Sequence, residues 1–238
     1  MKIIILAGGK GSRMKQDTPK CACLINNKPM INYLLETCVL LNPEEIIVIV
    51  GYKKEKVREV IKTKVTYIEQ YNQLGTADAI KSTYDHLKDY IGNILIIPGD
   101  TPLIPFSILK NLLENHKRQQ NKLTILSTYM NNPTGYGRIK REKGIITKIV
   151  EENEASNMEK EINEVNTGIY CINSRELFNN IYKIKNNNNK KEYYLTDIVE
   201  YIDSFESAVS YSTLFLQFKD DLESLGINNS YYLKSVID

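Results

Sequence analysis

The sequence lacks several features that mark specialised classes of protein. Among its 238 residues there is no tryptophan, and there are only two histidines. The apolar run at the N-terminus is too short for a signal peptide, and no later run approaches the ~20 residues that a membrane-spanning helix needs. Basic and acidic residues nearly balance, at 31 and 29. Because no large field of one sign can form, these numbers argue against a broad nucleic-acid or membrane-surface binder.

Cysteine is also scarce, and its spacing does not suggest a metal site. Cys21 and Cys23 form a C-x-C pair, but no second ligand cluster at metal spacing accompanies it, which argues against zinc. With Cys38 and Cys171 they are expected to be buried or half-buried free thiols in a reducing compartment. A cytoplasmic location follows as the default expectation.

Length and composition fit an ordinary globular domain. The chain is 42% hydrophobic and 25% charged, and its length suffices to bury a real core. We expect one domain over residues 1–238. Its most biased stretch, residues 183–191, is rich in asparagine and lysine, and we interpret it as a mobile surface loop. A basic nucleic-acid patch is the alternative, but the stretch has no interleaved aromatic residues.

The first 120 residues alternate between short β-branched runs and helical periods. Strands are expected at residues 2–6, 45–50, 65–69 and 93–97, and helices at 30–41, 55–62 and 76–87. Such alternation predicts an α/β fold with crossover connections and a mostly parallel sheet flanked by helices. Ligands of an open α/β sheet bind outside the carboxyl ends of its strands, so functional residues should lie just after them.

The pattern changes in the second half of the chain. Runs at residues 123–129, 137–150 and 164–172 indicate strands with hairpin-style connections, and therefore a small antiparallel extension. Helices are expected to return at residues 174–183, 196–205 and 230–236. Of the two histidines, His86 falls in the helix expected at 76–87, and His116 is expected to lie in a helix as well.

A glycine-rich turn follows the first expected strand. Gly8, Gly9 and Gly11 let backbone N–H groups approach an anion without obstruction by side chains. Three basic residues accompany them: Lys10, Arg13 and Lys20. The spacing is neither that of a P-loop nor that of the dinucleotide-binding fingerprint. This concentration of positive charge favours a triphosphate site over the simpler alternative, a tight turn with solvated basic residues.

The same turn carries a family resemblance. Leu6-x-x-Gly9-x-Gly11-Ser12-Arg13, followed by Pro19-Lys20, resembles the signature of the sugar-1-phosphate nucleotidyltransferases, and more narrowly the uridylyltransferase domain of the bacterial N-acetylglucosamine-1-phosphate uridyltransferases. Further blocks follow in family order at residues 70–77, 99–104, 133–139, 149–151, 164–168, 192–197 and 226–229. The resemblance implies a Rossmann-like, GT-A-like nucleotidyltransferase fold.

The resemblance further implies a UTP site in a nucleotide-binding half, residues 1–120. Its expected residues are Leu6, Ala7, Gly8, Gly9, Gly11, Lys20, Gln70, Gly75 and Thr76, with Arg13 and Lys20 as catalytic cations. The amide of Gln70 can read a pyrimidine edge with one donor and one acceptor. The alternative is a polar turn before a helix, with Thr76 as its N-cap.

Asp100 is the expected ligand for Mg²⁺. It follows an apolar strand and a glycine, where its carboxylate could meet the oxygens of a triphosphate; an isolated Asp here could also be a turn residue. The resemblance supplies Asn228 as a second ligand. One Asp and one Asn suit Mg²⁺, because this ion retains waters and takes phosphate oxygens as further ligands.

The sugar phosphate is expected over the second half, residues 121–238. By resemblance, the residues around N-acetylglucosamine-1-phosphate are Gly137, Glu151, Asn166, Glu192, Tyr194 and Thr196. Taken without the resemblance, residues 151–154 would be an exposed acidic turn. The loop 183–191 directly precedes Glu192 and could act as a lid.

The expected reaction transfers a uridylyl group from UTP to N-acetylglucosamine-1-phosphate, giving UDP-N-acetylglucosamine and pyrophosphate. Alternatives are another sugar-1-phosphate or base, or a catalytically silent nucleotide-sugar sensor. In bifunctional relatives a left-handed β-helix with acetyltransferase activity follows this domain, and no hexapeptide repeat occurs in this sequence. We therefore expect no acetyltransferase domain, no nucleic-acid partner and no membrane partner, and the oligomeric state stays open.

Overall fold

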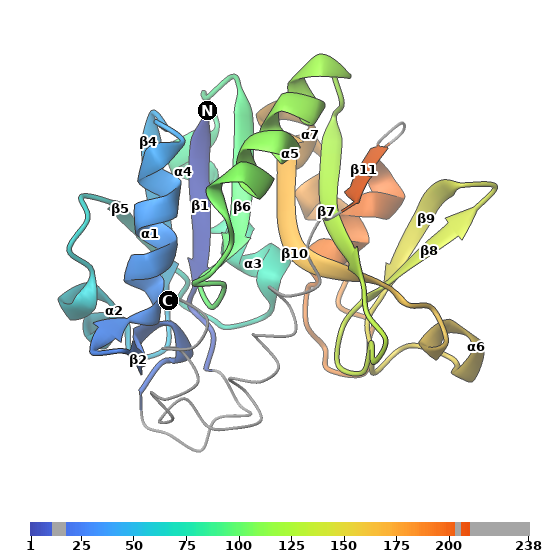
Figure 1. Cartoon of the computed structure of the whole chain (residues 1–238), viewed down its shortest axis with the longest axis horizontal. Helices are drawn as coiled ribbons and strands as arrows, with labels where there is room; N and C mark the ends of the chain where they lie inside the picture. Colours follow the sequence, from blue (N-terminus) through green and yellow to red (C-terminus); the bar gives the residue numbers. More distant parts are fainter. Residues whose placement is uncertain (11–17, 203–205, 210–238) are drawn as a thin grey trace.

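The computed structural model describes residues 1–10, 18–202 and 206–209. One large sheet forms its centre, with helices on both sides (Figure 1). The large sheet contains β1 (Lys2–Ala7), β4 (Glu45–Val50), β5 (Thr66–Glu69), β6 (Asn93–Pro98), β7 (Leu123–Tyr129), β8 (Arg138–Glu142), β9 (Ile145–Val150), β10 (Glu164–Asn173) and β11 (Glu206–Val209). A two-stranded sheet is formed by β2 (Leu24–Ile25) and β3 (Lys28–Pro29). The helix expected at 230–236 lies outside the described residues.

The sheet is parallel in its first half and mixed in its second, as predicted. Its strands run in the order β11-β7-β10-β6-β1-β4-β5, with β8 joined to β10 and β9. Strands β5, β4, β1 and β6 are parallel neighbours, whereas β10 runs antiparallel to both β6 and β7. Strand β11, which pairs parallel with β7, was not predicted.

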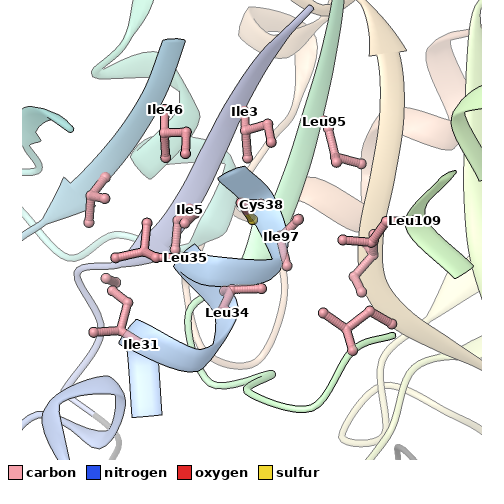
Figure 2. Close-up of a cluster of buried hydrophobic side chains, with 14 of the residues drawn as sticks. Ile3, Ile5, Ile31, Leu34, Leu35, Cys38, Ile46, Leu95, Ile97 and Leu109 are labelled. Carbon is pink, nitrogen blue, oxygen red and sulfur yellow. The ribbon is translucent and has the colours of Figure 1, made fainter. Parts of the chain in front are cut away.

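Two hydrophobic layers cover the two faces of the parallel strands. Alternate side chains point to opposite faces, so Ile3 and Ile5 enter one layer while Ile4 enters the other. The first layer contains helices α1 (Met30–Leu40) and α5 (Phe106–Arg118), and Figure 2 shows Leu34, Leu35 and Leu109 packed there. Strands that are buried on both faces explain the nearly continuous apolar runs in the sequence.

The remaining helices are short. They are α2 (Lys54–Val60), α3 (Thr76–Lys81), α4 (Tyr84–Leu87), α6 (Asn157–Lys160) and α7 (Ser174–Asn180), with the 3₁₀ helices η1 (Lys20–Ala22), η2 (Ile181–Lys183) and η3 (Leu195–Tyr201). Residues of α3, α4, α7, η2 and η3 belong to the second hydrophobic layer.

Three expected elements differ in the structure, each for a local reason. The helix expected at 76–87 is broken between α3 and α4, where Ser82 and Thr83 donate side-chain hydrogen bonds to backbone carbonyls three residues earlier. The strand expected at 137–150 is a hairpin, β8 and β9, turned by Lys143 and Gly144, which both have positive φ. The helix expected at 196–205 is the 3₁₀ helix η3.

The four cysteines agree with the sequence analysis. All four are buried free thiols. Burial raises the pKa of Cys21 and of Cys38 to about 12, which leaves both thiols uncharged and unreactive. Within the described ranges, no three metal-binding side chains come together, and no helix is long and apolar enough to cross a membrane.

Acid should destabilise the protein partly through His116, which lies in the interface between α5 and β7. Its ring is buried, its Nδ1 lies 2.9 Å from Thr124 Oγ1, and burial lowers its pKa to about 4. The unfolded chain protonates this imidazole below about pH 6.5 while the folded protein does not, so stability falls as the pH falls from 6.5 towards 4. We expect the wild type to lose about 2–3 kcal/mol more unfolding free energy than His116→Gln between pH 7 and pH 4.5.

Urea unfolding at both pH values measures this difference. His86→Gln is the control, because it removes a surface histidine that pairs with Glu45 and leaves His116 in place. Between the two pH values, His86→Gln should lose as much unfolding free energy as the wild type. Equal losses in wild type and His116→Gln would show that His116 does not contribute to the pH dependence.

Candidate nucleotide and sugar-phosphate site

The carboxyl ends of four parallel strands form one edge of the sheet, and the candidate site lies there. Strand β1 ends at Ala7, in register with Val50 of β4, while Leu6 pairs with Pro98 of β6. The chain runs outward from β1 through β4 to β5, and then returns to the other side of β1 as β6. Loops that leave β1 and β6 therefore part in opposite directions, which opens the crevice where α/β sheets bind ligands.

Lys20 and Asp100 meet across this crevice. Lys20 begins η1, directly after Pro19, and Asp100 follows Gly99 at the end of β6. Lys20 Nζ lies 2.9 Å from Asp100 Oδ2, and both side chains are largely buried, with 13% and 24% exposure. The pair places a cation and a hard oxygen ligand together beside the glycine turn.

The glycine turn itself is packed closely on the neighbouring loop. Gly8 C=O accepts a hydrogen bond from the N–H of Tyr52, at 3.0 Å. A Cβ added to Gly8 would lie 3.0 Å from Gln70 Oε1, and one added to Gly9 would meet no atom of the described residues within 4 Å. Gly8 is therefore packed closely against Gln70, whereas none of the described residues crowds Gly9.

Gln70 presents only an acceptor to a ligand. The sequence-based expectation was that its amide would offer one donor and one acceptor. The side chain is buried, and its Nε2 donates to the carbonyl of Gly75 at 3.1 Å and to Asp78 Oδ2 at 2.7 Å. Both amide hydrogens are used by these two bonds. The side-chain oxygen remains on the side of Gly8.

Gly75 and Thr76 join the two halves of the chain. Gly75 is the N-cap of α3, so the expectation that Thr76 would cap this helix is wrong. Instead, Thr76 Oγ1 accepts a hydrogen bond from the N–H of Leu195. Tyr193 completes the junction, since its N–H donates to Leu74 C=O and its own C=O accepts from Ala77 N–H.

An irregularity in β10 directs Asn166 to the same edge of the sheet. The pairing of β10 with β7 shifts register between Asn166 and Ile169, and Gly168 has a φ of +78°. Asn166 Nδ2 donates to the phenol oxygen of Tyr170 at 2.7 Å, and Asn166 Oδ1 accepts from Gly168 N–H at 3.1 Å. The bulge therefore fixes both ends of the Asn166 amide.

Glu151 lies opposite, at the end of β9, where Thr196 Oγ1 donates to its Oε1 at 3.1 Å. The turn that follows is less exposed than the acidic-turn alternative supposes. Glu152 forms an ion pair of 2.7 Å with the fully buried Arg138 and accepts from Gly135 N–H. Only Asn153 and Glu154 are exposed.

One cavity of about 840 Å³ unites these elements. Of the residues expected at the site, it is lined by Leu6, Ala7, Gly8, Gly9, Lys20, Gln70, Gly75, Thr76, Asp100, Glu151, Asn166, Glu192 and Thr196. Gly11, Arg13 and Asn228 were also expected here, and they lie outside the described residues. The cavity is thus lined by residues from both halves of the chain.

Two expected sugar-phosphate residues do not line this cavity. Gly137 supports it from behind, because its carbonyl accepts a hydrogen bond from Asn166 N–H. Tyr194 lines a second cavity of about 360 Å³, which shares Glu151 with the first. Burial, with nearby carboxylates, raises the pKa of Tyr194 to about 12, and burial raises that of Asp197, which lines the same second cavity, to about 6.

Several residues that line the larger cavity were not predicted from the sequence. Tyr170 and Cys21 are examples: both line it, but both occur in sequence patterns typical of a buried core. Lys10 was noted only as part of the positive charge near the turn, and it is exposed at the cavity. Only the three-dimensional arrangement identifies these residues as part of the wall.

The asparagine-rich loop is anchored on two sides. Asn188 accepts from Glu192 N–H and donates to Glu192 C=O through its side chain. Asn189 bonds the acidic turn, through Glu154 Oε1 and Asn153 C=O. The loop thereby links Glu192 to the turn after Glu151; movement as a lid stays a prediction.

Comparison with known structures supports the fold. The chain superposes on a putative glucose-1-phosphate thymidylyltransferase from Bacillus anthracis with a TM-score of 0.73 and 21% identity, covering 94% of this chain and 95% of that one. A UDP-glucose pyrophosphorylase gives a TM-score of 0.67 at 19% identity, covering 84% and 85%. The fold is therefore the Rossmann-like fold of nucleotidyltransferases, as the resemblance implied.

Sequence comparison gives closer relatives. The chain is 41% identical over 229 residues to the bifunctional protein GlmU of Acholeplasma laidlawii, which covers 96% of this chain and 49% of the relative. It is 40% identical over 234 residues to GlmU of Carboxydothermus hydrogenoformans, covering 98% and 51%. The chain thus spans about half the length of these curated relatives. Residues 2–218 match the model of the nucleotidyl transferase family, and the chain belongs to that family.

Proposed function

We propose that the protein transfers a uridylyl group from UTP to N-acetylglucosamine-1-phosphate, releasing pyrophosphate. The observation that carries this proposal is the single cavity whose wall combines the glycine turn with Glu151, Asn166 and Thr196. A nucleotide and a sugar phosphate held in one cavity can react without leaving it. We also infer that residues 1–238 act as one nucleotidyltransferase domain, with nucleotide-binding and sugar-phosphate-binding halves meeting at Gly75 and Tyr193.

The triphosphate is assigned to the crevice between β1 and β6. Gly8, Gly9 and Lys10 would supply backbone N–H groups and charge, and Lys20 would contact the phosphates from the opposite wall. On sequence grounds, Gly11 and Arg13 belong to this group as well. Leu6 and Ala7 would form the floor beneath the nucleoside.

Mg²⁺ is assigned to Asp100, and to Asn228 on sequence grounds. Nucleotidyltransferases of this family generally use a divalent metal ion. Asp100 fits Mg²⁺ because its carboxylate shares a cavity with the phosphate-binding turn, and this ion needs few protein ligands when phosphate oxygens are present. Bound there, Mg²⁺ would neutralise phosphate charge and favour departure of pyrophosphate.

The sugar is assigned to the far wall of the cavity. Glu151 and Glu192 offer carboxylate oxygens, Asn166 and Thr196 offer an amide and a hydroxyl, and all four line the cavity. Such groups can accept from and donate to the ring hydroxyls of a hexosamine. Gly137 and Tyr194 would act by supporting Asn166 and Glu151.

The proposed chemistry needs no general base. A phosphate monoester is already anionic, so its oxygen can attack the α-phosphorus of UTP directly while pyrophosphate leaves on the opposite side. Repulsion between the two anions is the main obstacle. Lys20, with Arg13, would lower it by holding both anions and stabilising the charge that develops on the leaving group.

Release of pyrophosphate from UTP tests the proposal. The protein should release it with N-acetylglucosamine-1-phosphate and Mg²⁺, and release should stop when EDTA removes the metal. Glucose-1-phosphate, galactose-1-phosphate and buffer alone are the comparisons. If the protein turns over another sugar phosphate faster, that sugar phosphate replaces N-acetylglucosamine-1-phosphate as the assigned substrate. Binding of a nucleotide sugar without any turnover would favour a sensor.

Replacing Gln70 should weaken the choice of base. In Gln70→Ala the buried acceptor beside Gly8 is lost, so a base with a ring N–H has no partner there. We expect the preference for UTP over CTP, measured as the ratio of kcat/KM values, to fall about tenfold. Gln119→Ala, which removes an exposed amide at the end of α5 that does not line the cavity, is the control and should keep the ratio. An unchanged ratio in Gln70→Ala would remove Gln70 from base recognition.

A further inference from the structure

Asp78 lies next to the base-reading residue but is not itself in the cavity wall. It is the third residue of α3, whose N-cap is Gly75, and its carboxylate is partly buried. An acidic side chain in the first turn of a helix is favoured by the helix dipole. The described structure gives this carboxylate a specific neighbour, since Asp78 Oδ2 accepts from Gln70 Nε2 at 2.7 Å.

The contacts of Gln70 determine which end of its amide faces the cavity. Nε2 donates to two acceptors, Gly75 C=O and Asp78 Oδ2. A rotation of the amide by half a turn would place Oε1 against both of these oxygens. Because an ionised carboxylate can only accept, neither contact could be restored after the rotation.

Asp78 contributes more to this preference than Gly75 does. The carbonyl of Gly75 also accepts from Ala79 N–H within α3, and its contact with Gln70 is longer, at 3.1 Å. The bond to Asp78 is charge-assisted and short. Gln70 is buried, so water cannot compensate for a lost bond.

We propose that Asp78 is a positioning residue that sets the choice of base by holding the Gln70 amide with its oxygen toward Gly8. This inference rests on the proposed function. An oxygen fixed in this place accepts from the ring N–H of uracil, whereas cytosine offers a bare ring nitrogen that repels it. Asp78 thereby favours UTP over CTP without touching either nucleotide.

Two variants test the proposal by the ratio of kcat/KM values for UTP and CTP, with N-acetylglucosamine-1-phosphate and Mg²⁺. Asp78→Ala removes the acceptor, and we expect the ratio to fall about tenfold, chiefly through a lower KM for CTP. Asp78→Asn keeps the shape but can donate as well as accept, so it tolerates both orientations of Gln70. It should fold like the wild type and lower the ratio about threefold. Asp85→Ala, which removes an exposed carboxylate in α4, should keep the wild-type ratio.

The double variant Gln70→Ala/Asp78→Ala separates positioning from a general structural role. If Asp78 acts through Gln70, the double variant should have the same ratio as Gln70→Ala alone. An additional fall in the double variant, or wild-type ratios in both Asp78 variants, would overturn the proposal.

The inference and the proposed function can fail separately. If the wild type releases no pyrophosphate, the proposed function is wrong, and the same variants are compared by the dissociation constants of UDP and CDP from calorimetry. If the Asp78 variants then lose preference for UDP over CDP, measured as the ratio of these dissociation constants, the role of Asp78 is supported. An unchanged ratio overturns it. If turnover is normal but Gln70→Ala keeps its selectivity, the role of Asp78 is overturned and the proposed function stands.

Discussion

Lys20→Ala is expected to lower turnover by a factor on the order of 10² or more while the protein stays folded. Lys20 is the cation of the described structure that lies between the glycine turn and Asp100, with its Nζ 2.9 Å from the carboxylate. In the proposed reaction two anions must approach each other, and charge accumulates on the departing pyrophosphate. A fixed ammonium in a largely buried position stabilises that charge more than water does.

The decisive measurement is kcat at saturating UTP, Mg²⁺ and sugar phosphate, since a residue used only for binding would raise KM and leave kcat intact. Lys20→Arg should not restore activity, because a planar guanidinium does not reproduce the compact charge of an ammonium. Lys122→Ala is the matched control: this lysine also pairs with a carboxylate, Glu176, but does not line the cavity. Near wild-type kcat in Lys20→Ala would refute the proposed role.

The parallel half of the fold is predictable from sequence because its strands are buried on both faces. In β4, residues 46–50 are apolar throughout because both faces of the strand are buried, and the limits of the strand in the structure, Glu45–Val50, agree with those expected. The carboxyl-edge rule then places Gly8, Gln70 and Asp100 at one site from the strand order alone. Periodicity, burial and chain topology act together here, so local and global signals agree.

The details of the site are less predictable, because they depend on contacts between distant segments. Thr76 has the sequence of an N-cap, yet its hydroxyl is bonded by Leu195, 119 residues further along the chain. The bulge that turns Asn166 toward the cavity produces no distinct sequence pattern beyond Gly168. Which end of the Gln70 amide faces the cavity is likewise set by Asp78, and a single sequence carries no signal for such a partner.

Gly75→Ala is expected to destabilise the protein by about 4 kcal/mol. Gly75 has a φ of +115° and a ψ of 178°, a region that is essentially restricted to glycine and costs other residues about 1–3 kcal/mol. A Cβ here would lie 2.5 Å from Tyr193 O and 2.8 Å from Tyr193 N. Since both are rigid backbone atoms, the loop and Tyr193 must separate, which strains or breaks two backbone hydrogen bonds worth about 1 kcal/mol each.

Gly144→Ala is the matched control for this substitution. Gly144 also has a positive φ, of +83°, but a Cβ added there would meet no atom of the described part of the chain within 4 Å. It should cost only the penalty of an alanine backbone at positive φ, about 1 kcal/mol. Thermal unfolding should therefore shift by roughly 2–4 °C in Gly144→Ala and by roughly 8–16 °C in Gly75→Ala. Equal shifts in the two variants would mean that the contact with Tyr193 contributes nothing.

Gly75→Ala should also impair activity below its unfolding temperature, whereas Gly144→Ala should not. Residues 74–77 carry part of the proposed nucleotide site, and Tyr193 precedes the segment that carries Thr196 of the sugar site. Forcing these segments apart widens the cavity between the bound substrates, and a displacement of about 1 Å costs on the order of 10²-fold in rate. The glycine thus links stability to catalysis, because the contact that joins the two halves also sets the distance between their ligands.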